Sequence, residues 1–168
     1  SGPAGGIAGV RAALDAEGCD SGVAFDVGGT STDVSLVTRE ARLRPVTEIA
    51  GLPLRTPSLD IHTIGSGGGS LAWLDAAGAL QVGPQSAGAK PGPACYGRGG
   101  TRATLTDALV VLGRLPGSLK LGGALELNHD LAQRACASLF VGQKGKGPQA
   151  RATAAAMVRV ALAGIERA

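Results

Sequence analysis

Apolar and polar residues alternate most clearly around residue 25. An apolar run at residues 23–25 ends in Asp26, passes two glycines and two hydroxyl residues, and resumes along Val34 and Leu36. Alternation of this kind on both sides of a glycine-containing turn is typical of paired antiparallel strands. We therefore predict a strand, a tight turn and a second strand over residues 22–38.

Helical periodicity occupies the start of the chain and its second half. Residues 3–17 place Ile7, Val10 and Leu14 at helical spacing, and Gly18 follows as a C-cap. Three later helices are predicted, over residues 106–115 behind a Thr106/Asp107 cap pair, over 128–140 behind Asn128, and over 149–167.

Short strands and glycine-rich connections fill the space between these helices. Strands are predicted at 42–46, 61–64, 71–74 and 79–82, an extended connection at 51–57, a long loop at 83–103 and a surface loop at 143–148. Strands early and helices late indicate an α/β protein. A length of 168 residues suits a single domain over residues 1–168.

The hairpin turn has the composition of a phosphate-binding turn. Gly28 and Gly29 can adopt positive φ and lack Cβ, so backbone N–H groups can converge on an anion, and Thr30 and Ser31 add hydroxyl donors. Asp26, at the strand end, is placed to hold a hydrated Mg²⁺ beside the phosphates. The alternative is a plain hairpin turn, because Asp-x-Gly-Gly is also common turn chemistry.

Composition and charge exclude several classes of partner. Glycine supplies 28 of 168 residues, in clusters rather than repeats, which indicates loops built for close backbone approach. A net charge of +3 without a basic run, and few aromatic residues, argue against nucleic acid as a partner. No apolar stretch approaches the roughly 20 residues of a membrane span.

The cysteines and the chain start bear on the protein's setting. The three cysteines show no CxxC spacing, so we expect neither disulfides nor a zinc knuckle, and we expect a cytoplasmic protein. The chain starts at Ser1 and contains one methionine, Met157, so we expect a piece of a larger protein.

Other chemistry-bearing residues have two interpretations each. Asp60 and His62 lie one residue apart on a predicted strand, where their side chains share a face and can share a metal, or serve only as a strand-end acid and a structural histidine. Asp107 either acts on metal or substrate or caps a helix. Cys95 is expected to pack rather than react, because no base lies near it in sequence.

The order of the glycine-rich blocks carries a family resemblance. Blocks at residues 1–4, 25–33, 63–70, 82–89, 91–100 and 106–108 occur in this order. The chain resembles the hydantoinase A / 5-oxoprolinase family over residues 1–125, most specifically in the Pro-Gly-Pro-Ala-Cys-Tyr-Gly segment at 91–97. It departs from the family pattern at Gly5, Gln85 and Leu109, where alanine, glutamate and asparagine are usual.

The resemblance implies an actin-like ATPase fold, a ribonuclease H-like lobe in which a mixed sheet is flanked by helices. The chain would be a C-terminal lobe fragment, and the missing N-terminal lobe would carry the first phosphate loop. Residues 26–30 would form the second phosphate loop, with Asp26 as the catalytic residue holding Mg²⁺-ATP. Gly67, Gly68 and Gly69 would face the nucleoside, although residues 65–69 alone are also compatible with a linker.

The resemblance also implies the reaction. We expect an ATP-dependent hydrolase subunit that opens a cyclic amide, hydantoin or 5-oxoproline, beside a hydantoinase B-type partner subunit. Phosphorylation of the amide oxygen would overcome the resonance that protects an unstrained lactam. The alternatives are an acetone carboxylase-like ATP-dependent carboxylase subunit, a small-molecule kinase, and a non-catalytic nucleotide-sensing or partner-binding lobe.

Overall fold

The computed structural model describes residues 2–40, 42–49, 51–116, 120–140 and 149–167. The chain forms two compact units, one of Ser1–Val27 with Thr32–Ile64 and one of Gly28–Ser31 with Gly65–Ala168. The single domain expected from the sequence stays a prediction. The predicted surface loop at 143–148 lies outside the described residues.

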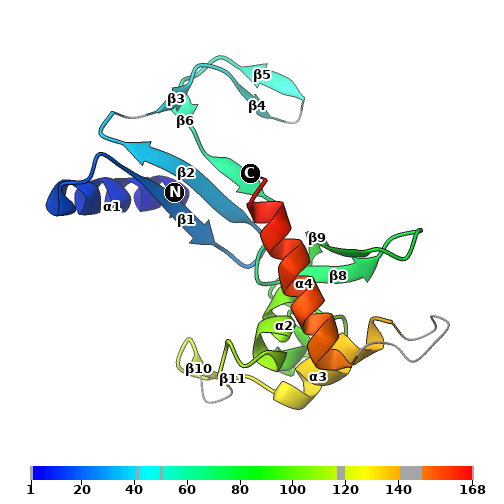
Figure 1. The fold of residues 1–168 in the computed structure, drawn as a ribbon. Helices are drawn as coiled ribbons and strands as arrows, with labels where there is room; N and C mark the ends of the chain where they lie inside the picture. The colour runs from blue at the N-terminus through cyan, green and yellow to red at the C-terminus, as the bar shows by residue number, and fades with distance from the viewer. Residues whose placement is uncertain (1, 41, 50, 117–119, 141–148, 168) are drawn as a thin grey trace. The chain divides into compact units, whose positions relative to one another are not determined.

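The first unit is a helix on a three-stranded antiparallel sheet. The strand order is β1 (Ser21–Val27), β2 (Thr32–Thr38) and β7 (His62–Ile64). β1 and β2 pair from Ser21 opposite Thr38 to Val27 opposite Thr32, so the predicted hairpin is confirmed. Helix α1 (Gly2–Glu17) lies along this sheet (Figure 1) and ends at Gly18, which has φ of +66°.

The two faces of this sheet differ in burial. Ala24 and Val37 are buried at 9% and 3% exposure on the side of α1. The alternate residues of β1, Val23, Phe25 and Val27, are 60%, 52% and 52% exposed. The sequence alternation therefore separates a helix-covered face from an apolar exposed face.

Beyond β2 the first unit continues into two short antiparallel pairs. β3 (Leu43–Arg44) pairs with β6 (Ser58–Leu59), and β4 (Thr47–Ile49) pairs with β5 (Leu52–Leu54). The extended connection predicted at 51–57 is thus partly wrong, because Leu52–Leu54 forms one strand of a hairpin. Proline has no N–H to donate, but Pro53 fits here because each strand of a two-stranded ribbon is an edge strand.

The second unit combines a hairpin with three helices, and its elements follow in chain order. They are β8 (Ser70–Leu74), β9 (Leu80–Ser86), the 3₁₀-helix η1 (Ala94–Tyr96), α2 (Leu105–Val111), β10 (Lys120–Leu121), β11 (Leu125–Glu126), α3 (His129–Ser138) and α4 (Ala150–Ile165). The strands predicted at 71–74 and 79–82 are confirmed. β9 runs further than expected, into the segment predicted as loop.

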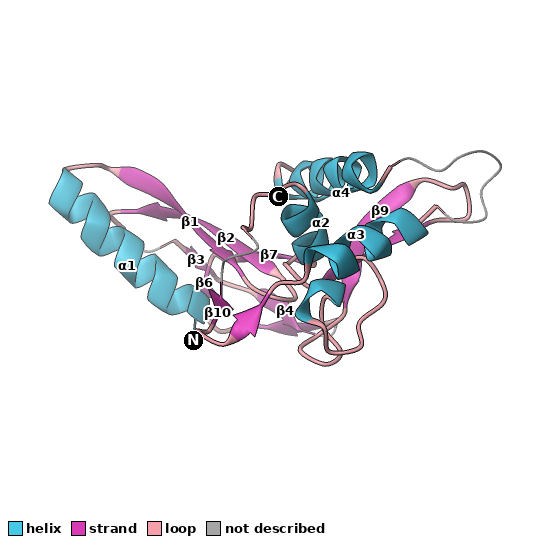
Figure 2. Ribbon diagram, turned by 90° about the horizontal axis from the view of Figure 1, so that it is seen from below, coloured by secondary structure: helices cyan, strands magenta, loops and turns pink. Residues whose placement is uncertain are grey.

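Helices α2, α3 and α4 pack on one another (Figure 2). They enclose an apolar core in which several positions are alanine, and small side chains let helices approach closely. The fully or nearly fully buried members include Ala108, Val110, Ala132, Cys136, Ala154 and Met157. The predicted α/β class is confirmed, and every strand pairing in the described ranges is antiparallel.

The helix caps test the sequence prediction closely. Asn128 caps α3 as predicted, because its side-chain oxygen accepts a hydrogen bond from the Leu131 amide at 3.0 Å. The Thr106/Asp107 cap pair is wrong, since α2 starts at Leu105 and its N-cap is Thr104. Asp107 is the third helical residue and closes a capping box with Thr104.

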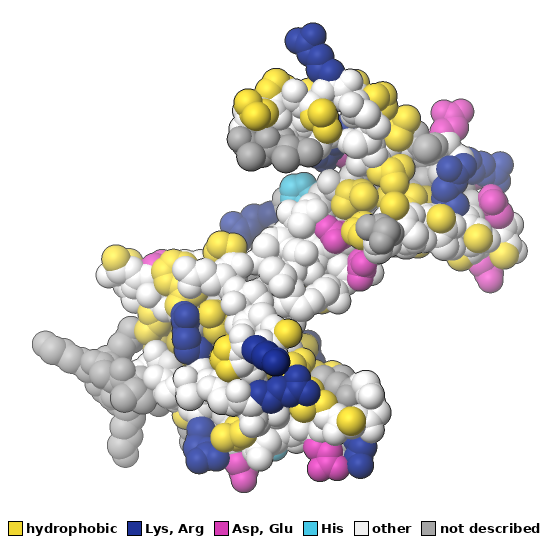
Figure 3. Space-filling model, turned by 180° about the vertical axis from the view of Figure 1, so that it is seen from behind, with side chains coloured by type: hydrophobic (Ala, Val, Ile, Leu, Met, Phe, Trp, Pro, Cys, Tyr) yellow, Lys and Arg dark blue, Asp and Glu magenta, His cyan; other side chains and the backbone are white. Residues whose placement is uncertain are grey.

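Surface charge is dispersed on the face that Figure 3 shows, where basic and acidic side chains are interspersed. In the described part of the chain, no helix combines the length and the apolar character that crossing a bilayer needs.

Candidate phosphate-binding site

The glycine-rich turn of residues 28–31 rests on the second glycine cluster of residues 67–69, within the second unit. The turn is closed by a hydrogen bond from the Gly28 amide to the Ser31 carbonyl at 2.8 Å. The amides of Gly68 and Gly69 donate to the carbonyls of Gly28 and Gly29, at 3.0 Å and 2.6 Å. Two glycine clusters that lie far apart in sequence thus form one hydrogen-bonded backbone unit.

Side chains are excluded from the contact between the two clusters. A Cβ atom on Gly67 would lie 2.6 Å from the Gly28 carbonyl oxygen and 2.8 Å from the Ser31 nitrogen, and one on Gly69 would lie 2.9 Å from the Gly29 oxygen. Such separations are well inside van der Waals contact. Gly67 and Gly69 are therefore required for close backbone approach, and nucleoside contact by residues 67–69 stays a prediction.

The cluster is supported from behind by the start of α2. The amide and the hydroxyl of Thr106 both donate to the Gly68 carbonyl at 2.8 Å. The linker interpretation of residues 65–69 is wrong, since their backbone is bonded to the turn on one side and to a helix on the other.

The turn leaves donors without protein partners. Within the described residues, the amides of Gly29, Thr30 and Ser31 donate no hydrogen bond to a protein acceptor, and neither does the hydroxyl of Thr30 or Ser31. The adjoining carbonyls are occupied by the glycine cluster. Successive backbone N–H groups of this kind form an anion-binding concavity.

In the first unit, two carboxylates face each other across the hairpin. Asp26 in β1 is the register partner of Asp33 in β2, and both line a cavity of about 100 Å³ between the sheet and α1. The hydroxyl of Thr63 donates to the Asp33 carboxylate. Like charges directly opposite on a strand pair are destabilising unless a cation lies between them, so this donor set fits a hydrated divalent cation.

Comparison with known proteins identifies the family. The model of the hydantoinase/oxoprolinase family matches residues 1–168. The chain belongs to the hydantoinase/oxoprolinase family. It is 48% identical to a 5-oxoprolinase of Saccharomyces cerevisiae over 119 residues, which cover 68% of this chain and 9% of the relative.

Solved structures of relatives share the fold. Nucleotide-free acetone carboxylase, described as performing ATP-dependent acetone carboxylation, superposes with a TM-score of 0.83 at 31% identity, over 95% of this chain and 22% of that one. ATP-dependent caprolactamase from Pseudomonas jessenii gives a TM-score of 0.79 at 34% identity, over 96% and 24%. The fold is that of the actin-like ATPases.

The chain spans between 9% and 19% of the length of the curated relatives it matches.

One departure from the family pattern has a simple structural explanation. A Cβ on Gly5, where the family usually has alanine, would meet no atom within 4 Å, so either residue fits in α1.

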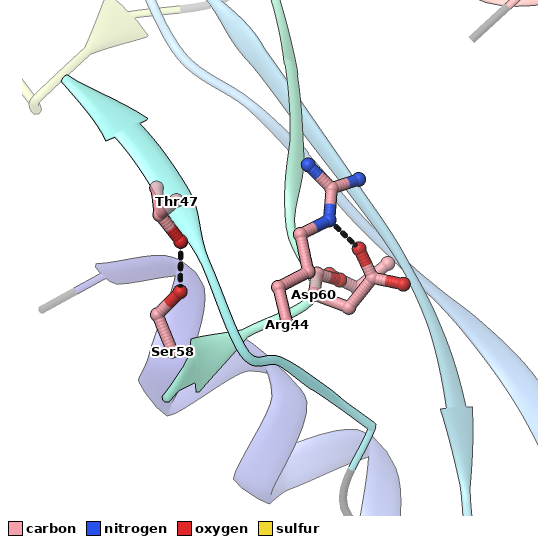
Figure 4. A network of polar contacts seen from close by, with 5 residues as sticks. Arg44, Thr47, Ser58 and Asp60 are labelled. Atoms are coloured by element: carbon pink, nitrogen blue, oxygen red, sulfur yellow. Dashed lines mark hydrogen bonds and ion pairs between the residues drawn. The ribbon is translucent and has the colours of Figure 1, made fainter. Parts of the chain in front are cut away.

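Asp60 and His62 are arranged differently from the sequence expectation. They do not share a strand, because β6 ends at Leu59 and β7 begins at His62, with a tight turn in which the Ile61 amide donates to the Leu59 carbonyl at 2.9 Å. The Asp60 carboxylate is paired with Arg44 (Figure 4). No group of three or more His, Cys, Asp or Glu residues suited to a metal occurs in the ranges that the structure describes.

Asp107 has a structural role in this family member. Its side chain is fully buried and accepts hydrogen bonds from the amides of Ala94 and Cys95, at 3.2 Å and 2.7 Å. It also accepts from the amide and hydroxyl of Thr104, at 2.9 Å and 2.8 Å. One carboxylate therefore caps α2 and anchors the loop that contains η1.

Cys95 lies in the core, as the sequence analysis expected. It is fully buried, and burial together with the nearby Asp107 carboxylate raises the pKa of its thiol far above the usual range. A protonated, inaccessible thiol is a poor nucleophile. His129 is the exposed first residue of α3.

Asp33 is a candidate site residue that the sequence interpretation did not include. The signal was present, because Asp26 and Asp33 are placed symmetrically about the four-residue turn Gly28–Ser31. In an antiparallel hairpin, residues equidistant from the turn are cross-strand partners on one face.

Proposed function

We propose that this chain contributes a phosphate-binding part of the ATP site in an enzyme that opens cyclic amides. The observation that carries the proposal is the turn Gly28–Ser31, with three successive amides and two hydroxyls that have no protein partner in the described structure. Family membership and two structural relatives described as ATP-dependent support nucleotide use.

The residues of the chain take separate roles in this proposal. The amides of Gly29, Thr30 and Ser31 bind phosphate oxygens, while residues 67–69 hold the turn in its shape. Asp26 and Asp33 would hold Mg²⁺, and such an ion supplies charge neutralisation in phosphoryl transfer. Other phosphate contacts come from the rest of a longer polypeptide, in keeping with the small share of its relatives that the chain spans.

The chemistry follows from the stability of the amide. Water attacks an unstrained lactam slowly because attack destroys amide resonance. Transfer of the γ-phosphoryl group to the amide oxygen, with loss of ADP, creates a phosphorylated imidate. Water then adds to its carbon and the ring C–N bond breaks, with the proton from water passing to the departing nitrogen. A second water hydrolyses the resulting acyl phosphate to the carboxylic acid and phosphate. Positioning and charge neutralisation supply most of the catalysis of such a transfer.

A carboxylase is the second candidate. The higher of the two TM-scores, 0.83, belongs to acetone carboxylase, and an acetophenone carboxylase gamma subunit of Aromatoleum aromaticum is 43% identical over 139 residues. The same phosphate turn would serve either reaction. The partner subunit would be of the hydantoinase B type in the hydrolase case.

The test is ATP consumption by the full-length protein with its partner subunit. We expect ADP release that depends on 5-oxoproline, a hydantoin or caprolactam, and not on ketones with bicarbonate. Dependence on a ketone and bicarbonate instead would establish the carboxylase. If neither the cyclic amides nor a ketone with bicarbonate stimulates ADP release, both the hydrolase and the carboxylase proposals are refuted.

A matched pair of variants tests the turn itself. A Cβ on Gly29 meets no atom within 4 Å in the structure, and the same is true of Gly9 in α1. Gly29→Ala should weaken ATP binding roughly tenfold or more, because it crowds the unpartnered amides that would bind a charged ligand. Gly9→Ala should leave ATP binding unchanged. Equal ATP affinities of the two variants would show that the turn does not bind ATP.

A further inference from the structure

A second concave site lies in the second unit, on the loop that follows β9. The cavity has a volume of about 370 Å³, within the range of small-molecule pockets. Its lining combines two cations, two hydroxyls, several glycines and apolar residues. Among the lining residues are Leu71, Ser86, Lys90, Gly100, Thr101 and Arg102.

The charge of this cavity is of one sign. Lys90 and Arg102 both line it, and no acidic residue in the part of the chain that the structure describes does. Neither side chain forms an ion pair or a hydrogen bond within the described residues. Two unpaired cations at one cavity attract an anion, and the hydroxyls of Ser86 and Thr101 are suitable donors to its oxygens.

Close packing holds the backbone of the loop that carries Lys90 and Arg102. A Cβ on Gly100 would overlap the carbonyl oxygen of Gly92, and Gly92 has φ of +74°. Asp107 holds the next segment through the amides of Ala94 and Cys95. The loop is therefore closely packed against itself and against α2, so Lys90 and Arg102 project from an ordered backbone.

The cavity adjoins the phosphate turn through a single residue. The Gly69 amide donates to the Gly29 carbonyl at 2.6 Å, and the Gly69 carbonyl accepts from the Ala87 amide at 2.8 Å. Ala87 lines the cavity beside Ser86. Gly69 therefore links the lining of the cavity by backbone hydrogen bonds to the turn that we propose binds ATP.

From these observations we propose that the Lys90/Arg102 cavity binds the carboxylate of a small organic acid, as the substrate-recognition site of the proposed enzyme. Lys90 and Arg102 pair with the carboxylate oxygens, Ser86 and Thr101 donate to them, and Leu71 contacts the apolar part of the molecule. Because the described lining residues include no acid, the cavity disfavours cationic substrates. This inference rests on the proposed function for the identity of the ligand as a substrate.

The test compares an acid with its neutral counterpart on the full-length protein. The probes are 5-oxoproline and 5-oxoprolinamide, which differ only in replacement of the carboxylate by an amide, and binding is measured by calorimetry without ATP. Wild type should bind the acid at least tenfold more tightly than the amide. Lys90→Gln and Arg102→Gln should each remove most of that difference, with little effect on the amide.

Arg98→Gln is the matched control. Arg98 lies on the same loop but does not line the cavity, so this variant should retain the preference for the acid. Unchanged preference in Lys90→Gln and Arg102→Gln, or equal weakening of acid and amide binding, would overturn the proposal.

A nucleotide phosphate is the other possible source of an oxyanion. Titration of ATP into the same variants distinguishes it, because the proposal predicts unchanged ATP affinity in Lys90→Gln and Arg102→Gln. Weakened ATP binding with intact acid binding would make the cavity a nucleotide site and refute the proposal. These measurements involve no turnover, so failure of acid recognition is distinguishable from failure of the proposed ATP-dependent reaction.

Discussion

Gly67 lies so close to Ser31 that a Cβ atom on Gly67 would stand 2.8 Å from the Ser31 backbone nitrogen. The contact joins residues 36 positions apart in sequence and leaves the Gly28–Ser31 turn no room to move toward the glycine cluster. Its consequences for stability and for ligand binding can be separated.

Gly67→Ala is expected to destabilise the protein by about 1–3 kcal/mol, because the added methyl group overlaps backbone atoms that cannot rotate away. Urea unfolding of the variant and of Gly29→Ala provides the measurement. Gly29→Ala should change the free energy of unfolding by no more than about 1 kcal/mol, since its Cβ meets no atom within 4 Å. Similar costs for the two variants would contradict the close approach.

Asp33→Asn should have opposite effects on stability and on metal dependence. Removal of one of two opposed carboxylates relieves repulsion, so stability without Mg²⁺ should rise by roughly 0.2–1 kcal/mol. The Mg²⁺ concentration required for ATP binding should rise at the same time. Thermal unfolding in EDTA measures the change in stability, and a Mg²⁺ titration of ATP binding measures the change in metal requirement. A loss of stability with an unchanged Mg²⁺ requirement would show that Asp33 has only a structural role.

Asp107→Asn should cost about 1–3 kcal/mol, since an amide nitrogen cannot accept from the buried donors that the carboxylate satisfies. We expect faster proteolysis within residues 87–103 and a lower urea midpoint. Asp15→Asn is the control, because Asp15 is exposed on α1, and should behave as wild type. Normal stability of Asp107→Asn would show that the loop is held by other contacts.

The cysteines should differ sharply in reactivity. Burial, with a smaller contribution from Asp107, raises the pKa of the Cys136 thiol to about 12, and burial also raises that of Cys95, whereas Cys19 is exposed. At pH 8 a thiol reagent followed by peptide mapping should label Cys19 alone among the three. Rapid labelling of Cys136 in native protein would contradict its burial.

The raised thiol pKa values also set a pH dependence. Well below pH 9, both the folded and the unfolded states hold these thiols protonated, so these thiols do not make stability depend on pH there. Between the usual value of 9.0 and about 12, the unfolded chain releases protons that the folded Cys136 retains. Stability should therefore fall as pH rises through this window, and Cys136→Ala should weaken the dependence.

The sequence predicted the elements whose signals are local. Period-two alternation located the hairpin around Asp26, and Asn128 marked the start of α3. The hairpin of β4 and β5 was missed because Pro53 argues against a strand, although an isolated edge pair accepts it. Strand β9 likewise continues past Gly83. A register shift interrupts its pairing with β8 after Val82 opposite Ala72, and pairing resumes at Ser86 opposite Ser70.

The site was predictable in composition but not in arrangement. The glycines and hydroxyls of the turn indicated anion binding, whereas the contact of Gly67 with Ser31 depends on tertiary approach. The role of Asp107 was equally hidden, because its partners Ala94 and Cys95 lie 12 or 13 residues away. The pairing of Asp60 with Arg44 was hidden for a similar reason, because the two residues lie 16 positions apart.

The carboxylate of Asp107 belongs at once to the first turn of α2 and to the loop around η1. Neither segment can open locally without exposing the same buried charge, so the two should exchange amide hydrogens as one cooperative unit. The first turn of α2 also binds Gly68 through Thr106. Opening of the loop would therefore loosen the support of the Gly28–Ser31 turn, so order in the turn would depend on order in the loop.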